Sequence, residues 1–297
     1  MDEFFCHDGS EHSRPQSLCS LCSLCLCVDD FGLHEGINTA ALQLAERERV
    51  HAIACMVGAP AWKAGHSAAQ RMDAGAVDLG LHLDLTEYPL QRQTRRTVAH
   101  WIWESYLGRL DRDMVRAEIR AQLEAFESAM GRPPAFVDGH QHVHQFPGVR
   151  DELLEELACR YGSFKPWIRS TQASSHLRPG LHGGWRGLAK SRVIALLGAS
   201  GMALAATRGH YLQNRHLLGV YDFQATPDRY RAMLRACLAL GEEGDLLMCH
   251  PSTQLQRTDP IHAARKMEFE VLGSSTFGQW LVEAGVELRA MSRILER

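Results

Sequence analysis

The chain has 297 residues, of which 45% are hydrophobic and 23% are charged, and its formal net charge is -3. This length is enough for one large α/β domain with a sizeable core. Positive and negative residues are mixed along the chain, so there is no electrostatic footprint for nucleic acid or an anionic membrane. The composition therefore favours a small polar substrate and predicts neither a nucleic-acid nor a membrane partner.

The N-terminal residues 1–22 are polar and lack periodicity, which predicts a disordered extension rather than a signal peptide. Nine cysteines make an odd count without the spacing of a secreted disulfide framework, so we expect a reducing, cytoplasmic location. The most apolar later stretch, 193–206, is shorter than the roughly 20 residues that span a bilayer. We therefore expect no membrane insertion.

The folded part is predicted as a single domain over 23–297 that starts with a buried strand at 24–28. This run is wholly apolar, which is typical of a strand covered on both faces of a parallel sheet. Cys25 and Cys27 fall inside it, where free cysteine behaves as a small apolar residue. This interpretation is favoured over a zinc or iron–sulfur site built from the Cys19-x-x-Cys22-x-x-Cys25 spacing, because no second cysteine pair follows.

Helices and strands alternate along the rest of the chain. Region 163–214 is patterned more poorly and is interpreted as an elaborated loop or crossover with one moderately apolar helix. Alternation of this kind implies parallel pairing, and the predicted fold class is α/β, a TIM-barrel-like (β/α) barrel. The predicted helices are 37–49, 60–73, 113–130, 149–161, 227–240, 263–272 and 276–284, and the further strands are 50–57, 77–85, 135–138, 245–249 and 286–289.

Polar residues gather where predicted strands end. In an α/β barrel the catalytic residues come from the carboxyl ends of different strands, so we expect these groups to converge. The groups are Asp29 with Asp30, His82 with Asp84, Asp138 with His140, and His250.

Asp29 and Asp30 are adjacent carboxylates at a strand end, where they cannot both face the same way. One can bind a metal ion while the other takes a proton from the water that the ion activates. The alternative is ordinary turn or helix-cap chemistry.

His250 precedes a proline, which forces an extended backbone there, and it is a candidate general acid toward a leaving group.

The histidines have similar alternatives. His82 shares a strand face with Asp84, either as a hydrogen-bonded core pair or as a metal ligand with its supporting carboxylate. His140, His142 and His144 stand on alternate residues and would share one face of an extended strand, a density that indicates a metal site.

No glycine-rich phosphate loop and no Gly-x-Ser-x-Gly elbow is present, which disfavours nucleotide and serine-nucleophile chemistry.

Four motifs in order, at 28–38, 80–87, 138–144 and 248–251, resemble the YdjC-like carbohydrate deacetylases. This family includes the chitooligosaccharide deacetylases and a hopanoid-biosynthesis-associated branch. The similarity runs from about residue 24 to the C-terminus. Cys27-Val28 departs from the family pattern, in which Asn-Ala commonly precedes the double aspartate.

The resemblance implies a barrel of the glycoside hydrolase/deacetylase type, related to the polysaccharide deacetylases. It implies a divalent metal ion bound by Asp30, His82 and His140. Asp29 would be the general base and His250 the acid. Histidine and carboxylate ligands suit magnesium or zinc, and also manganese or cobalt. Residues expected to support the ligands or to contact substrate are Asp84, Asp138, His142 and His144.

The implied reaction is hydrolysis of an N-acetyl group on an amino sugar or oligosaccharide by metal-activated water. One alternative keeps the metal and changes the bond, as in another amidohydrolase or a phosphoesterase. Another alternative is a catalytically inactive sugar-binding or metal-binding barrel. A homodimer is the default expectation for assembly.

Overall fold

A computed structural model describes residues 21–174, 182 and 184–296. Its centre is an eight-stranded sheet in the order β5-β4-β3-β2-β1-β7-β6, with β8 paired to β1. The strands are β1 Cys22–Phe31, β2 Ala52–Cys55, β3 Asp78–Leu83, β4 Phe136–Gly139, β5 Trp167–Ile168, β6 Leu217–Leu218, β7 Leu246–Cys249 and β8 Val286–Leu288.

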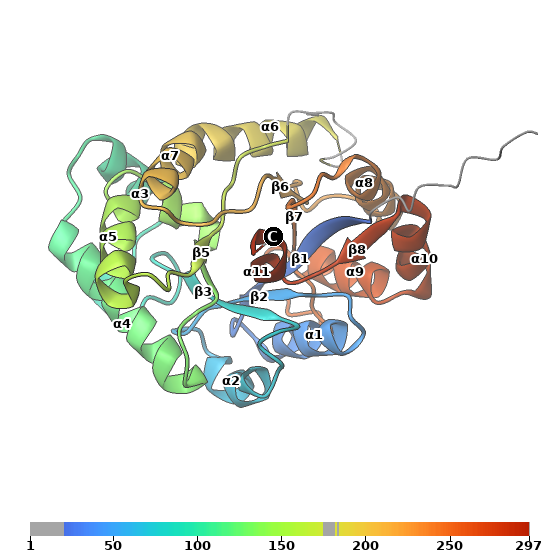
Figure 1. The fold of residues 1–297 in the computed structure, drawn as a ribbon, viewed down its shortest axis with the longest axis horizontal. Helices are drawn as coiled ribbons and strands as arrows, with labels where there is room; N and C mark the ends of the chain where they lie inside the picture. The colour runs from blue at the N-terminus through green and yellow to red at the C-terminus, as the bar shows by residue number, and fades with distance from the viewer. Residues whose placement is uncertain (1–20, 175–181, 183, 297) are drawn as a thin grey trace, which may run out of the picture.

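The strand pairs are parallel throughout the described sheet. A parallel bridge between Ile168 and Gln213 joins the β5 edge to the segment before β6, so the sheet curves into an irregularly closed barrel. The helices lie around its outside (Figure 1). The predicted α/β barrel is thereby confirmed. The α-helices are α1 Glu35–Glu46, α2 Trp62–Gln70, α3 Val98–Tyr106, α4 Arg112–Met130, α5 Val149–Tyr161, α6 Trp185–Ile194, α7 Ser200–Arg208, α8 Pro227–Leu240, α9 His262–Leu272, α10 Ser275–Ala284 and α11 Met291–Leu295.

The barrel interior is a small apolar core of its own, separate from the larger core between sheet and helices. Cys25 and Cys27 belong to it, which confirms that they pack as small apolar residues. Met291 and Ile294 of α11 pack against the same core. Asp78, at the start of β3, accepts a hydrogen bond of 2.6 Å from Ser292 Oγ. Helix α11 therefore closes the end of the barrel where β3 begins, and the polar residues lie at the other end.

The region 163–214 holds more structure than the sequence pattern predicted. It contains β5 and the helices α6 and α7, which a π-helical turn η4, Ala195–Ala199, joins. Together they form a 24-residue helical segment, Trp185–Arg208, that by length and composition alone could cross a membrane. The sequence pattern had marked only 193–206. Helix α3 was also missed, and the predicted N-terminal extension lies outside the described residues as far as residue 20.

Candidate metal centre and active site

The end of β1 turns both carboxylates toward one cavity. The β1–β2 register shifts between Val28 and Phe31, and Asp30 has a left-handed backbone with φ 66°. As a result Asp29 and Asp30 both line the cavity, so the expectation that they face apart is wrong. A non-glycine residue in this conformation costs on the order of 1 kcal/mol or more, and it persists only where its contacts hold it.

Asp30 is the centre of a buried ionic cluster. Its Oδ1 lies 2.9 Å from His140 Nδ1 and 3.4 Å from His82 Nε2. Its Oδ2 accepts a 2.7 Å hydrogen bond from Arg265. Burial by itself raises the pKa of Asp30, but Arg265 and His140 outweigh burial and hold this pKa well below its usual value. The carboxylate is therefore charged, with one oxygen directed at the two imidazoles.

His82 is oriented by the neighbouring strand. The parallel register places it opposite Asp138, and its Nδ1 lies 2.7 Å from Asp138 Oδ1. Burial lowers the pKa of His82, but Asp138 outweighs it and raises this pKa to about 9. The alternative of a His82–Asp84 pair is wrong. Asp84 instead accepts the backbone N–H groups of Thr86, Glu87 and Tyr88 and fixes the loop after β3.

The histidine run does not continue the strand. β4 ends at Gly139, and His140–Gln145 form a 3-10 turn, η2, in which Gln141 and His142 have φ 52° and 59°. A Cβ atom on residue 139 would lie 2.8 Å from the His144 backbone nitrogen, so the turn needs glycine there. The expectation of one shared strand face is wrong. Among the three imidazoles, His140 is the one that reaches Asp30.

The other two imidazoles occupy different positions. His142 lines the cavity, and its buried Nδ1 has no hydrogen-bond partner among the described residues. Burial lowers the pKa of His142 well below its usual value. His144 is fully buried, donates from Nε2 to the Arg169 carbonyl at 3.1 Å, and has a pKa that burial lowers to about 4. His142 is thus placed to contact a ligand, whereas His144 supports the strand end beneath it.

Asp29 is held by a fully buried arginine that follows β5. Both its oxygens lie 2.6 Å from the Arg169 guanidinium, which also approaches Asp138 Oδ2 at 2.7 Å. Burial lowers the pKa of Arg169, but Asp138 and Asp29 outweigh it and raise this pKa well above its usual value. The fork fixes the rotation of the Asp29 carboxylate and links it to the partner of His82.

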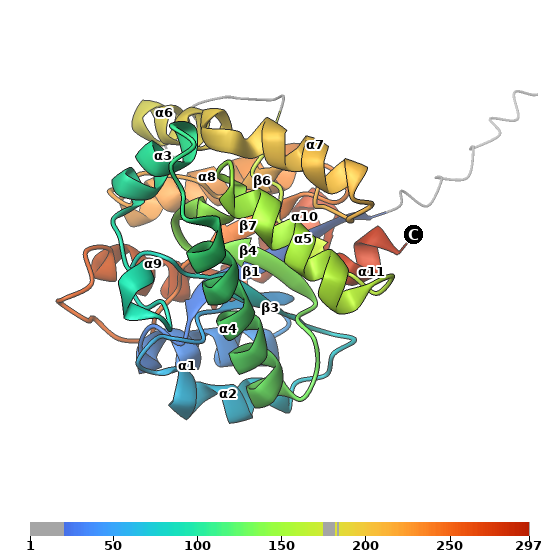
Figure 2. The ribbon, with the colours of Figure 1, turned by 90° about the vertical axis from the view of Figure 1, so that its left-hand side faces the viewer.

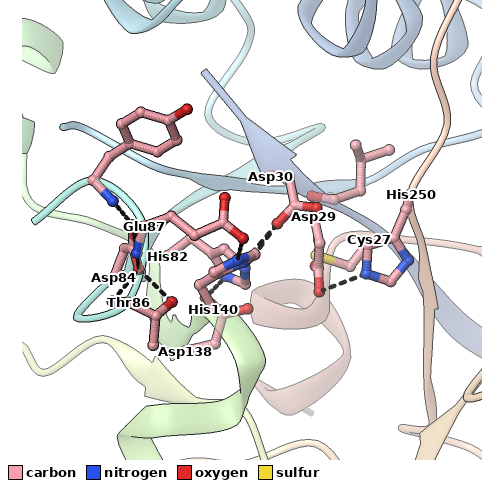
Figure 3. Close-up of polar contacts among 12 residues, drawn as sticks. Cys27, Asp29, Asp30, His82, Asp84, Thr86, Glu87, Asp138, His140 and His250 are labelled. Atoms are coloured by element: carbon pink, nitrogen blue, oxygen red, sulfur yellow. Dashed lines mark hydrogen bonds and ion pairs between the residues drawn. The ribbon is translucent and has the colours of Figure 1, made fainter. Parts of the chain in front are cut away.

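His250 approaches Asp29 from the end of β7. Its Nε2 lies 3.9 Å from Asp29 Oδ2, and its ring stands edge-on to Phe223. Figure 3 shows Asp29 between His250 and Asp30. The backbone N–H of His250 donates to Glu268 Oε2 at 2.5 Å. Burial lowers the pKa of His250 to about 4, so this histidine is neutral at pH 7.

Three residues of the cluster were missed by the sequence analysis. Arg169 follows the apolar pair of β5, which is the same strand-end signal as the others, but a two-residue strand has no periodicity. Arg265 lies inside α9 and carries no local signal. Glu87 ends the second motif, and its Oε1 lies 3.2 Å from His140 Nε2.

Within the part of the chain that the structure describes, two sets of side chains place ligand atoms within 4.8 Å of one another. In the set of Asp29, His82 and Asp138, both carboxylates are already engaged by Arg169. The set of Asp30, His82 and His140 offers one carboxylate oxygen and two imidazole nitrogens, all buried. These donors suit a divalent ion such as zinc, manganese or magnesium. The structure thus brings together the three predicted ligands.

The site opens into a cavity of about 770 Å³. The polar cluster forms its floor, and the carboxyl ends of β1, β3, β4 and β7 supply it. Its walls include apolar side chains, among them Val98 and Ile102 of α3 and Ile194, Leu197 and Phe223. The cavity thus combines a charged floor with apolar side chains in its walls.

In α/β-barrel enzymes the active site lies at the carboxyl ends of the strands, which is where the buried carboxylate–histidine cluster lies here. The chain belongs to the YdjC-like protein family, whose model matches residues 23–283. It is 26% identical to a chitooligosaccharide deacetylase of Enterobacter sp. (strain 638), over 88% of this chain and 94% of that protein. It is 31% identical to a chitooligosaccharide deacetylase of Serratia marcescens over 46% of this chain and 55% of that protein.

The fold also resembles a solved structure described as a candidate cellobiose-phosphate cleavage protein from Enterococcus faecalis V583. The TM-score is 0.67 at 18% sequence identity, with 93% of this chain and all (100%) of that chain covered. At this identity the likeness shows the fold alone. It agrees with the barrel that the strand order defines.

Proposed function

We propose that this protein is a metal-dependent carbohydrate deacetylase that hydrolyses the N-acetyl group of an acetylated amino sugar or oligosaccharide. The observation that carries the proposal is the buried set Asp30, His82 and His140 beside a second carboxylate, Asp29, on the floor of one cavity. Family membership and the relatives named chitooligosaccharide deacetylases support it.

In this proposal Asp30, His82 and His140 would hold a divalent cation, which would supply Lewis-acid activation of water and of the acetyl carbonyl. Asp138 fixes the ring orientation of His82 through the 2.7 Å contact to Nδ1. Arg265 occupies Asp30 Oδ2 and so leaves Oδ1 as the ligand atom.

The proton has a short path. Asp29 takes a proton from the attacking water as general base. Because His250 is neutral at pH 7, it does not begin the reaction as an acid. We propose that the proton passes from Asp29 to His250 Nε2, 3.9 Å away, and then to the departing amine nitrogen. The bond that breaks is the amide C–N bond, and the products are acetate and the free amino sugar.

The test is acetate release from N-acetylglucosamine oligomers, with metal analysis of the purified protein. Asp29→Asn should lower kcat by at least about a hundredfold, which is the lower range for a general base, while the bound metal stays at the wild-type amount. Asp228→Asn, at a side chain that is 93% exposed, is the matched control and should behave as wild type. Unchanged turnover in Asp29→Asn would contradict the assigned base.

The two alternatives predict different results. A phosphoesterase more often uses a second metal with a bridging carboxylate, and here Arg169 engages both carboxylates of the second set. Release of phosphate from p-nitrophenyl phosphate without acetate release would favour that reading. Metal binding with no turnover of any acetylated sugar would favour an inactive barrel.

A further inference from the structure

The wall of the cavity continues into an exposed apolar surface. We define the α3/α6–α7 face as the large apolar side chains that these helices expose to solvent. Trp185 is 76% exposed and Leu196 is 81% exposed. In a soluble protein such a concentration of apolar side chains marks a binding surface. The members of the face are Trp103, Tyr106, Leu107, Trp185, Val193, Leu196 and Leu204.

The two parts of this face lie side by side at the mouth of the cavity. Ile102 and Leu197 line the cavity, and their sequence neighbours Trp103 and Leu196 are exposed. Figures 1 and 2 both show α3 next to the α6–α7 segment at one edge of the molecule. The exposed face and the cavity wall are therefore continuous.

The α6–α7 segment is not shaped to cross a bilayer. Leu197 and Gly198 break the helix with non-helical backbone angles. A Cβ atom on residue 198 would lie 2.4 Å from the Gln145 carbonyl oxygen, so the break rests against the turn of the histidine run. Leu188, Met202 and Ala206 are buried, and Met202 and Ala206 belong to the larger hydrophobic core. One side of the segment is thus fixed to the protein, and the other side lies along the surface, as in interfacial helices.

The charge of this face is opposite to that of the whole chain. Residues 185–208 contain four basic residues and neither Asp nor Glu, whereas the net charge of the chain is -3. Lys190 lines the cavity and lies over the Phe223 ring, so the exposed charges of the segment are Arg186, Arg192 and Arg208. Residues 92–109, which include α3, contain four arginines and one acidic residue, Glu104. Exposed tryptophan beside arginine and lysine is the composition of segments that bind anionic lipid headgroups. A second copy of the chain would bring the same positive charge against this face.

We propose that the α3/α6–α7 face docks onto the surface of an anionic lipid bilayer, with its tryptophans and leucines in the headgroup region and the mouth of the cavity at the lipid surface. The overall charge predicted no membrane partner because a whole-chain average conceals the sign of one face. The proposal concerns where the protein binds and stands apart from the reaction.

The test is sedimentation of the full chain with vesicles of phosphatidylcholine, and with vesicles that also contain phosphatidylglycerol. We expect binding to the anionic vesicles, weaker binding at high salt and little binding to the neutral vesicles. The Trp185→Ser/Leu196→Ser variant and the Arg186→Glu/Arg192→Glu variant should each lower the partition constant by about tenfold or more. Circular dichroism of each variant verifies that it is folded.

Matched controls separate the face from general surface effects. Phe164→Ser/Val282→Ser removes apolar side chains that are 90% and 83% exposed elsewhere. Arg231→Glu/Arg235→Glu reverses charges on α8 that are 48% and 62% exposed. Both should bind vesicles as wild type does. The proposal is overturned if anionic vesicles do not bind the protein, or if the controls lose as much binding as the face variants. It is also overturned if the face variants bind vesicles as wild type does and differ from it only by dissociation of a dimer.

Discussion

Arginine–carboxylate networks occur in two contrasting places. Around Arg169, which is 0% exposed, the network joins Asp29 and Asp138 beneath the cavity. Between α4 and α5, Arg112, which is 57% exposed, and its neighbours along α4 reach carboxylates of α5. The residue types are the same, but only the first network buries its arginine. On α4 the arginines reach solvent, although their partners Glu152 and Glu156 are 1% and 7% exposed. We call it the buried network and the second the helix-surface network.

Burial changes what each charge requires. A buried ion without its partner costs several kcal/mol, since water cannot replace the partner. An exposed pair contributes between about 0 and 1 kcal/mol, because water and salt screen it. The buried network therefore fixes one arrangement of side chains, as a catalytic floor requires, while the helix-surface network only adds to helix packing.

Removal of Arg169, the central cation of the buried network, is expected to have the largest effect on stability. Arg169→Met leaves Asp29 buried without its arginine and leaves Asp138 with His82 as its remaining positive partner. We therefore expect the free energy of unfolding to fall by about 3–5 kcal/mol. Urea unfolding followed by circular dichroism measures this value. Arg169→Lys, which keeps the charge but loses the fork, should lose less stability. A loss below about 1 kcal/mol in Arg169→Met would mean that water reaches these carboxylates.

Glu268 is a buried carboxylate that, unlike Asp29, has no arginine within hydrogen-bond distance among the described residues. The pH dependence of stability therefore tests what a buried carboxylate does without such a partner. Burial raises the pKa of Glu268 to about 7 from 4.5. The folded state then binds this proton more tightly, so its stabilisation is complete below about pH 4.5 and is lost as pH rises through about 7. The stability of wild type relative to Glu268→Gln should fall by up to about 3 kcal/mol between pH 5 and 8.

The control for this titration is Glu283→Gln, at a side chain that is 62% exposed. Its stability relative to wild type should not change over the same pH range. If the Glu268→Gln difference is equally flat, Glu268 is charged in the folded protein throughout, and its contacts with the Tyr221 hydroxyl and the His250 N–H outweigh burial.

The smallest effect is expected in the helix-surface network. Arg120 is 54% exposed and pairs at 2.8 Å with Glu156, which is 7% exposed and keeps Arg160 at 3.9 Å as a second cationic neighbour. Arg120→Met should lower the free energy of unfolding by less than about 1 kcal/mol, and 1 M salt should remove most of the difference. A loss comparable with that of Arg169→Met would show that exposure does not separate the two networks.

Much of the barrel could be predicted from sequence because its longer strands and helices carry clear patterns. The apolar run around Val28 and the helical periodicity of 149–161 needed no tertiary information. Polar residues at the carboxyl ends of predicted strands were expected to converge, and Asp30, His82 and His140 do lie together in the structure. Short elements such as β5 could not be found, since two residues have no period.

The remaining errors have physical causes in three dimensions. The register shift at the end of β1 lets adjacent aspartates share a cavity, and no local sequence signal marks it. The turn after Gly139 depends on close contact with His144, so the alternation of the three histidines does not place them on one face. Arg265 reaches Asp30 from a helix 235 residues later in the sequence. Such a contact depends on topology rather than on any neighbouring residues.

The pairing of β1 also bears on how the chain folds. This strand carries both aspartates, yet Cys25 pairs with Leu246 of β7 and Leu24 pairs with Leu288 of β8. Contacts so distant in sequence form late, because a long loop must close before they add stability. During synthesis one edge of β1 stays open until almost the whole chain has been made. A chain that stops before Leu246 would therefore expose an apolar strand edge and be prone to aggregation.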